Sequence, residues 1–280
     1  MAETAAENGT NPWGRRYLMC PPAHYDVLYR INPWMDGEVP VDPDRAQAQW
    51  DSVVTLLRDA GASIELQEPQ AGLPDLVFTA NAGLVNGDRF VASRFRNPER
   101  QGEEAHDVAW FDAHGWDVHE LPPDVSHEGA GDALPFGGVL LSGHQWRSDV
   151  RAQPLLADLL RVPVRPVGLT DERFYHLDIT FCPLDERHAL TTPGVWDAAG
   201  AETVAGLVPE PLALEVHEAE TFCANSVVIG RNVVMTSCPP RVGRQLEAWG
   251  FSVAVADVSE FLKAGGGVRC LTLALDVSLP

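Results

Sequence analysis

The sequence predicts an α/β fold in which a strand–strand–helix–strand unit repeats around an axis. Two segments, NAGLVNGDRFVAS (81–93) and NSVVIGRNVVMTS (225–237), each place an Asn before an apolar strand, a short turn containing Gly and a second strand. Each is followed by a helix containing arginine and then by another strand. A repeat of roughly fifty to sixty residues with this content is typical of radially arranged folds.

Short apolar, β-rich runs predict the strands, and the longer segments between them predict helices at 42–62, 97–115 and 239–250. Pro and Gly are spread along the chain, and no low-complexity linker divides it, which favours one domain. We expect residues 1–16 to be a disordered tail and residues 17–280 to be a single domain. The expected strands lie at 15–20, 62–67, 83–95, 137–143, 176–184, 225–237, 251–257 and 270–277.

The composition excludes several classes of protein. The 280 residues are 45% hydrophobic, and no apolar run is long enough to cross a bilayer. Forty acidic against twenty basic residues give a formal charge of −20, which repels nucleic acid and anionic membranes. The first residues, MAETAAENGT, lack the basic and apolar regions of a secretory signal, so we expect a cytoplasmic protein. Five dispersed cysteines without C-x-x-C spacing predict free thiols and no zinc site.

Polar residues in four short segments interrupt the apolar pattern. Each residue alone has a structural explanation, as a turn carboxylate, a cap, a core histidine or a small buried thiol. Together they contain a nucleophile, a proton donor and carboxylates able to bind a planar cation. The four segments are PDLVFTANAG with Asp75 and Asn81, HEGAGDAL with Glu128 and Asp132, HLDITF with His176 and Asp178, and GGGVRC with Cys270.

In this order, the motifs PDLVFTANAG, FRNPERQGE, EGAGD, HLDITF and GGGVRC resemble those of the guanidine-modifying enzymes of the pentein superfamily. That group includes arginine deiminases, dimethylarginine dimethylaminohydrolases and amidinotransferases. The resemblance runs from about Tyr17 to the C-terminus, and LMCPPAHYDVLYRINPWM and FTANAGLV are most similar to the arginine dihydrolases. It implies a pentein α/β propeller, with five pseudo-symmetric ββαβ modules around a central channel, in agreement with the hairpin repeat.

The resemblance also implies catalytic roles. Cys270 matches the nucleophile of the family, His176 its general acid and base, and Glu128 the acid that hydrogen-bonds the histidine or the substrate. The implied reaction is an attack of Cys270 on the guanidinium carbon, loss of ammonia with a proton from His176, and hydrolysis of the covalent thiouronium by a water that His176 activates. It requires no metal and no organic cofactor.

Five further residues match substrate-binding positions. Asp75 and Asp178 match carboxylates that hold the guanidinium, and such pairs are bidentate elsewhere in proteins. Arg100 and Arg147 match residues that bind the substrate α-carboxylate, with Arg94 as a weaker alternative. A bound guanidinium would also favour the thiolate form of the cysteine, and Arg269 either adds to this effect or points away. The glycines at 265–267 are expected to let the backbone approach the substrate closely.

Asn81 stands where deiminases and dimethylarginine enzymes usually carry Asp. An amide donates hydrogen bonds as well as accepting them, so this position suits the ureido oxygen of citrulline as well as a guanidinium. We therefore expect dihydrolysis of arginine to ornithine, carbon dioxide and ammonia. The expected binding partner is this small substrate, and a homodimer is possible. Dimethylarginine hydrolysis, which a second carboxylate at Asp178 disfavours, and amidinotransfer remain as alternatives. A binding protein resembling the ribosomal-subunit anti-association factors has no reason to carry the complete Cys-His-acid set.

Overall fold

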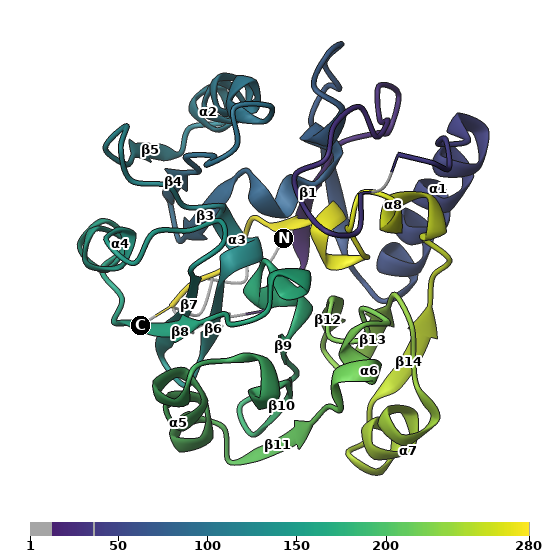
Figure 1. The fold of residues 1–280 in the computed structure, drawn as a ribbon, viewed down its shortest axis with the longest axis vertical. Helices are drawn as coiled ribbons and strands as arrows, with labels where there is room; N and C mark the ends of the chain where they lie inside the picture. The colour runs from purple at the N-terminus through teal and green to yellow at the C-terminus, as the bar shows by residue number, and fades with distance from the viewer. Residues whose placement is uncertain (1–12, 36, 280) are drawn as a thin grey trace, which may run out of the picture.

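A computed structural model describes residues 13–35 and 37–279. Its strands form five three-stranded sheets that are arranged in a ring, as Figure 1 shows. In each sheet, the central strand pairs antiparallel with one neighbour and parallel with the other. The prediction of an α/β propeller made of five ββαβ modules is confirmed.

The second module illustrates the plan of the repeat. The strands β3 (Gly83–Asn86) and β4 (Arg89–Ala92) form a hairpin, the helix α2 (Glu104–Ala113) follows, and β5 (Asp117–Glu120) pairs in parallel with β4. Three later modules repeat it: β6 (Ala133–Phe136), β7 (Val139–His144), α4 (Ala152–Leu160) and β8 (Val164–Gly168); β9 (Phe181–Pro183), β10 (His188–Thr191), α5 (Ala198–Leu207) and β11 (Glu210–Ala213); β12 (Ser226–Ile229), β13 (Asn232–Met235), α7 (Pro240–Ala248) and β14 (Ser252–Val255).

The first module is shared between the two ends of the described chain. Its strands are β15 (Leu273–Ala274), β1 (Arg16–Met19) and β2 (Ser63–Leu66), and β15 pairs antiparallel with β1. The helix α1 (Pro43–Asp59) connects β1 to β2 and begins at Asp42, whose side chain accepts a hydrogen bond from the backbone N–H of Arg45. The ring is therefore closed by one short strand that follows the fifth module in the chain.

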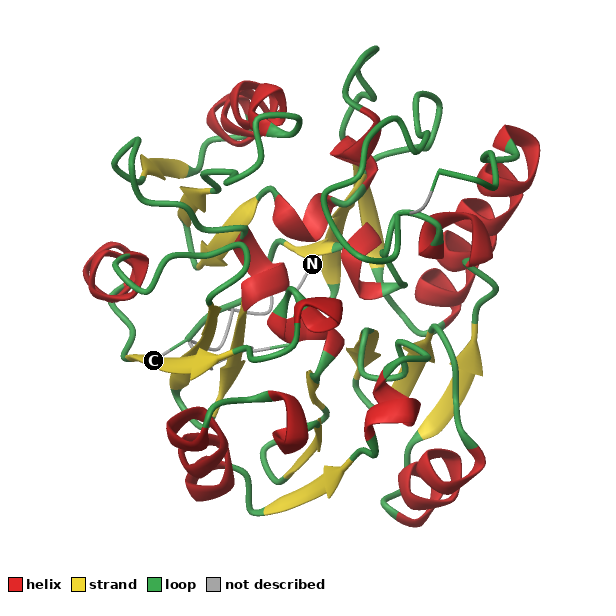
Figure 2. Cartoon of the chain, in the orientation of Figure 1, coloured by secondary structure: helices red, strands yellow, loops and turns green. Residues whose placement is uncertain are grey.

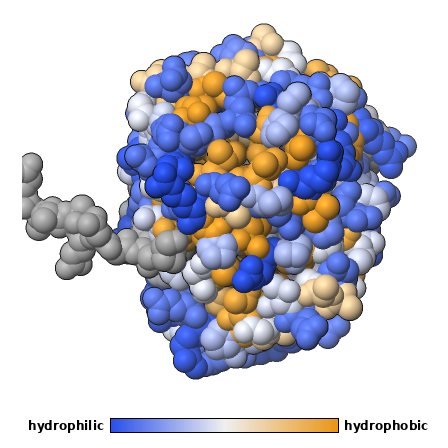
Figure 3. All heavy atoms as spheres, turned by 90° about the vertical axis from the view of Figure 1, so that its left-hand side faces the viewer, coloured by the Kyte–Doolittle hydropathy of each residue, from blue (hydrophilic) through white to orange (hydrophobic). Residues whose placement is uncertain are grey.

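Burial decreases from the axis of the ring outward. The strands β6, β9 and β12 are buried along their whole length, whereas β2 and β5 on the outer side of their sheets are partly or fully exposed. The five long helices lie on the outside of the ring (Figure 2). On the face shown in Figure 3, hydrophilic residues predominate around smaller hydrophobic areas. Among the described residues, no helix is both long and apolar enough to span a bilayer.

The structure differs from the sequence prediction at several elements. The apolar alternation of HLDITF imitates a strand, but residues 177–179 form a 3₁₀ turn closed by the Thr180 N–H on the Leu177 carbonyl at 2.9 Å. In the same way, residues 269–271 form a turn, and the strand after it has only two residues. The helix α4 was not predicted, because Pro154 lies within it, in a first turn where proline is tolerated. The Ala- and Gly-rich helix α5 was also not predicted.

The N-terminal boundary also differs from the prediction. Of the expected tail, residues 1–12 lie outside the described part of the chain. Residues 13–16 belong to the folded part: the Trp13 indole N–H donates to the Pro183 carbonyl at 3.2 Å, and β1 begins at Arg16. The backbone N–H of Arg15 donates to the carboxylate of Asp276 at 2.8 Å. The partly buried Trp13 side chain and these hydrogen bonds fix a segment whose sequence alone looks polar and loop-like.

Candidate active site

Short helical turns precede the inner strands of the modules, and these turns carry the polar residues singled out in the sequence. The turns η2 (Thr79–Asn81), α3 (Gly129–Asp132), η5 (Leu177–Ile179) and η7 (Arg269–Leu271) contact one another near the axis, η2 with α3 and η7, and α3 with η5. A pocket there is lined by residues from four modules, including Asp75, Asn81, Arg100, Arg147, His176 and Cys270. The inner strands converge on the axis, so residues far apart in the sequence meet.

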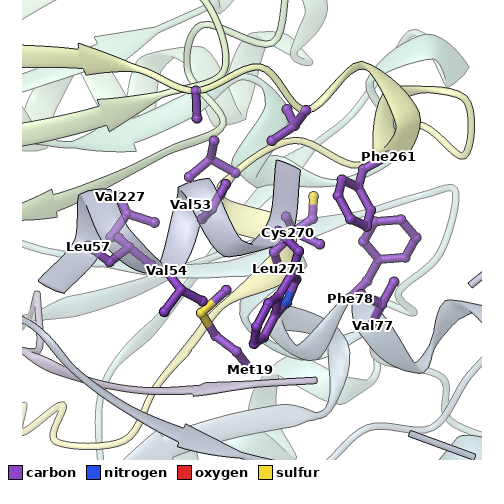
Figure 4. Close-up of a cluster of buried hydrophobic side chains, with 14 of the residues drawn as sticks. Met19, Val53, Val54, Leu57, Val77, Phe78, Val227, Phe261, Cys270 and Leu271 are labelled. Atoms are coloured by element: carbon purple, nitrogen blue, oxygen red, sulfur yellow. The ribbon is translucent and has the colours of Figure 1, made fainter. Parts of the chain in front are cut away.

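Cys270 occupies the side of this pocket that adjoins the core of the first module. Figure 4 shows it next to Leu271 and near Phe78 and Phe261, within a cluster of buried hydrophobic side chains. Its Sγ lies 3.2 Å from Nδ2 of Asn225 and 3.7 Å from Oδ2 of Asp178. Burial raises the pKa of the Cys270 thiol well above its usual range, and the Asp178 carboxylate raises it further. The thiol is therefore protonated in the free protein, and its activation requires an additional positive charge.

His176 and Glu128 form a buried pair beside the cysteine. The His176 Nε2 lies 2.9 Å from Oε2 of Glu128, and the same oxygen accepts a hydrogen bond from Nη1 of Arg147 at 2.8 Å. Burial alone would raise the pKa of Glu128, but Arg147 and the hydrogen bond from His176 together lower it well below its usual range. Glu128 is therefore an ionised carboxylate that can stabilise a positively charged His176.

Two buried carboxylates have oxygen atoms without a hydrogen-bond partner. Oδ1 of Asp75 and Oδ1 of Asp178 are buried and accept no hydrogen bond from the described residues. Burial raises the pKa of both groups, to about 6 for Asp178. The second oxygen of Asp75 lies 3.9 Å from Nε of Arg100, and that of Asp178 lies 3.7 Å from Sγ of Cys270. A buried carboxylate oxygen without a partner costs free energy, so the two Oδ1 atoms indicate a site for a ligand that donates hydrogen bonds and carries positive charge.

Arg100 is held by acidic and amide partners. Its Nε and Nη2 donate to the two carboxylate oxygens of Glu103 at 2.9 and 2.7 Å, and its Nη1 donates to Oδ1 of Asn81 at 2.8 Å. Its Nη2 also donates to the backbone carbonyl of Asp75 at 3.2 Å. These contacts favour a role in fixing Asn81 and Asp75 over the predicted role as a binder of the substrate α-carboxylate.

The other two arginines differ from each other in their position. Arg147 lines the pocket, donates to Glu128 and to the Ile31 carbonyl, and also lines a wider opening that includes Arg30. Arg94 does not line the pocket: its guanidinium pairs with Glu104 at 2.7 Å and Glu120 at 2.6 Å. The position of Arg94 outside the pocket and its two ion pairs argue against the weaker alternative that it binds the substrate carboxylate.

The amide of Asn81 has a fixed orientation. Its Oδ1 accepts from Arg100, and its Nδ2 donates to the Glu128 carbonyl at 3.1 Å. An amide nitrogen has two N–H groups, so one N–H of Asn81 is left without a partner among the described residues. A Cβ atom on Gly131 would lie 2.5 Å from Nδ2 of Asn81 and 3.0 Å from Nδ1 of His176, which explains the glycine of the EGAGD motif.

The glycines before Cys270 are also required by neighbouring side chains. A Cβ atom on Gly266 would lie 2.2 Å from the Phe78 ring, and one on Gly267 would lie 2.6 Å from Oδ1 of Asn225. Gly265 has a positive φ of 80°, which favours glycine. Gly266 also lines the pocket, and close approach of the backbone to a substrate there remains a prediction.

Sequence reasoning missed Asn225, Asn32 and Tyr175. Asn225 contacts Cys270, and the other two line the pocket. The signal that could have found Asn225 was the repeat itself, because Asn81 and Asn225 both open a copy of the hairpin motif. Asn32 lies between β1 and α1, in a segment without regular structure. Among the described residues, no group of three or more His, Cys, Asp and Glu side chains is arranged to hold a metal ion.

The burial of Asp107 predicts that the stability of the protein depends on pH. Gln67 donates to its Oδ1 at 2.8 Å, yet burial raises the pKa of Asp107 to about 7. The unfolded chain loses this proton at lower pH than the folded protein, so stability falls as pH rises from about 4 to about 7. Asp107→Asn should therefore raise the free energy of unfolding near pH 8 by on the order of 2–4 kcal/mol, and by less near pH 5.

Urea denaturation of both proteins at the two pH values measures this difference. Asp112→Asn is the matched control, because Asp112 lies on the same helix and is exposed. An equal gain from Asp107→Asn at both pH values would show that Asp107 is not protonated in the folded protein.

No family model matches the chain. Over 263 residues it is 44% identical to the bifunctional arginine dihydrolase/ornithine cyclodeaminase of Nostoc sp., a match that covers 92% of this chain and 37% of that protein. This chain thus spans little more than a third of the length of that relative. Over 266 residues it is 40% identical to the N(G),N(G)-dimethylarginine dimethylaminohydrolase of Mycobacterium tuberculosis, covering 94% of this chain and 87% of the relative.

Solved structures of the same group match closely. The N-terminal domain of ArgZ, an arginine dihydrolase from cyanobacteria, was solved with substrate bound and matches with a TM-score of 0.92 and 40% identity, covering 95% of this chain and 99% of that one. A variant of that domain, covalently bound to a reaction intermediate, matches with a TM-score of 0.92 and 41% identity over the same shares of the two chains. A dimethylarginine dimethylaminohydrolase adduct, at 19% identity and a TM-score of 0.75, shares the fold.

Proposed function

This chain belongs to the pentein guanidine hydrolases, the family of the arginine dihydrolases and dimethylarginine dimethylaminohydrolases, and from this we propose that it hydrolyses arginine to ornithine, carbon dioxide and ammonia. The observation that carries the choice of reaction is the orientation of Asn81, whose oxygen is occupied by Arg100 and whose nitrogen keeps an N–H for a ligand. A guanidinium only donates hydrogen bonds, whereas the oxygen of a ureido group needs a donor such as this N–H.

In the first half of the reaction, the unpartnered oxygens of Asp75 and Asp178 bind the guanidinium. The bound positive charge lowers the pKa of the Cys270 thiol, and its sulfur attacks the guanidinium carbon. A C–S bond forms, and a C–N bond breaks as His176 gives a proton to the departing nitrogen, which leaves as ammonia. His176 then takes a proton from water, whose oxygen displaces the sulfur and yields citrulline.

In the second half, citrulline is attacked in the same site. Its carbonyl oxygen accepts a hydrogen bond from the N–H of Asn81 that has no other partner. The same hydrogen bond stabilises the negative charge that develops on this oxygen during the attack. Loss of the second ammonia leaves a thiocarbamate on Cys270. Water releases it as a carbamate of ornithine, which loses carbon dioxide, so that arginine and two waters give ornithine, carbon dioxide and two ammonia.

Asn81→Asp should stop the reaction at citrulline. A carboxylate accepts hydrogen bonds from the guanidinium and from Arg100 but offers no donor to the ureido oxygen, so we expect the rate of ornithine formation to fall about 10²-fold or more while citrulline accumulates. Mass spectrometry of the products from arginine and from citrulline measures both steps.

The matched control for this variant is Asn86→Asp. The Asn86 amide likewise donates to a carbonyl, that of Leu160, and accepts from the Leu279 N–H, but it lies outside the pocket. Unchanged ornithine formation in Asn81→Asp would contradict the role of the amide. If the unmodified protein accumulates citrulline without ornithine, the dihydrolase proposal fails.

Dimethylarginine hydrolysis is the second candidate, and the relative from Mycobacterium tuberculosis favours it. The buried position of Asp178 next to Cys270 argues for unsubstituted N–H groups in the guanidinium. Parallel assays with arginine and dimethylarginine distinguish the two, and faster turnover of dimethylarginine would replace the first proposal.

We also propose a cytoplasmic location, which the five free thiols support, because disulfides are rare in that compartment. The homodimer expected from the sequence remains a prediction.

A further inference from the structure

Asn225 contacts the sulfur of Cys270 from a different module. It lies in the turn before β12, is completely buried, and its Nδ2 is 3.2 Å from Sγ. Its Oδ1 accepts the backbone N–H groups of Arg269 at 3.0 Å and Cys270 at 3.4 Å. Since these two N–H groups can only be bound by an oxygen, the orientation of the amide is fixed and its nitrogen must face the sulfur.

The surrounding contacts hold this arrangement in place. Thr236 donates to the Asn225 carbonyl at 3.2 Å and accepts the backbone N–H of Val268 at 2.9 Å. A Cβ atom on Gly267 would lie 2.5 Å from Oγ1 of Thr236, so only glycine fits at this point of the turn. Three successive backbone N–H groups of the turn are therefore bound by two side chains of the fifth module, and this turn positions the nucleophile.

We propose that Asn225 is a catalytic residue that donates a hydrogen bond to the attacking sulfur, so that Cys270 reacts as a thiolate in a fixed position. This rests on the proposed function of Cys270 as the nucleophile. Asn225 supplies a donor to the sulfur, and Asp178 is an acceptor for the protonated thiol. When a guanidinium occupies Asp178, the amide N–H remains as the hydrogen bond that the thiolate accepts. The other titratable and charged groups that line the same pocket are His176, Tyr175, Asp75, Arg100 and Arg147, and the charge of Arg269 acts on Asp178.

The test uses Asn225→Ala, which removes the donor, and Asn225→Asp, which keeps an oxygen for the backbone N–H groups of the turn. In the absence of substrate, the rate of alkylation of Cys270 by iodoacetamide should fall about tenfold in both variants at each pH, because a smaller fraction of the thiol is ionised. In turnover, the acidic limb of the pH profile of kcat should move to higher pH by about one unit, with a small change in KM. Asn86→Asp should change neither measurement.

Two results would overturn the proposal. A fall of kcat at every pH without movement of the acidic limb would mean that Asn225 only supports the turn. Unchanged alkylation in Asn225→Asp would mean that the amide does not stabilise the thiolate. The proposed function is tested separately, because complete alkylation of Cys270 in the unmodified protein must abolish turnover whatever Asn225 does.

Discussion

Cys270→Ser should lower kcat by about 10⁴-fold or more while the protein remains folded and binds arginine. A hydroxyl ionises far less readily than a thiol, and burial and Asp178 already oppose the negative charge at this position. The carboxylates of Asp75 and Asp178 do not depend on the sulfur, so binding should persist. Steady-state kinetics with arginine, together with calorimetric titration of the variant, measures both effects.

Cys182→Ser is the matched control for this change. Cys182 is also completely buried, and its Sγ lies 3.8 Å from the carbonyl oxygens of Pro183 and Ser226. A serine there keeps acceptors for its hydroxyl, so activity should stay within about twofold of the unmodified protein at modest cost in stability. Turnover that survives in Cys270→Ser, or is lost equally in Cys182→Ser, would contradict a covalent role for Cys270.

Glu128→Gln should lower kcat by about 10²–10³-fold. The variant removes the negative charge that stabilises protonated His176, and it leaves Arg147 without its ion pair at 2.8 Å. The acid step, in which ammonia departs, should slow most. Because Arg147 and His176 keep the pKa of Glu128 well below its usual range, the unmodified protein should not lose activity through protonation of Glu128 at mildly acidic pH.

The pH profile of kcat for Glu128→Gln, compared with that of the unmodified protein, tests this assignment. Glu218→Gln is the matched control, since Glu218 is also buried and paired with an arginine, Arg241, but does not line the pocket. Activity of Glu128→Gln equal to that of this control would remove Glu128 from the acid–base pair.

The sequence predicted the parts of this molecule whose evidence is local or repeated. Two hairpins that open with Asn81 and Asn225 indicated radial repetition, and the five-module ring agrees with it. Cys270 and His176 line one pocket, and Glu128 lies 2.9 Å from His176, while the catalytic roles of these three residues remain predictions. It could not predict that Arg100 is bound by Glu103, three residues later, because a sequence gives the charge of a side chain but not its partner. Asn225 was missed because its contact with Cys270 joins residues separated by 45 positions.

The closure of the ring by β15 has a consequence for the synthesis of the protein. When residues up to 255 have left the ribosome, every strand from β1 to β14 is available for folding. Cys270 and β15, which pairs antiparallel with β1, are still missing at that point. Until then one edge of β1 is unpaired, and such an edge is open to association with other chains. Pairing between residues so far apart is also intrinsically slow. The segment that carries Cys270 is therefore also the segment that pairs with β1 and protects its edge.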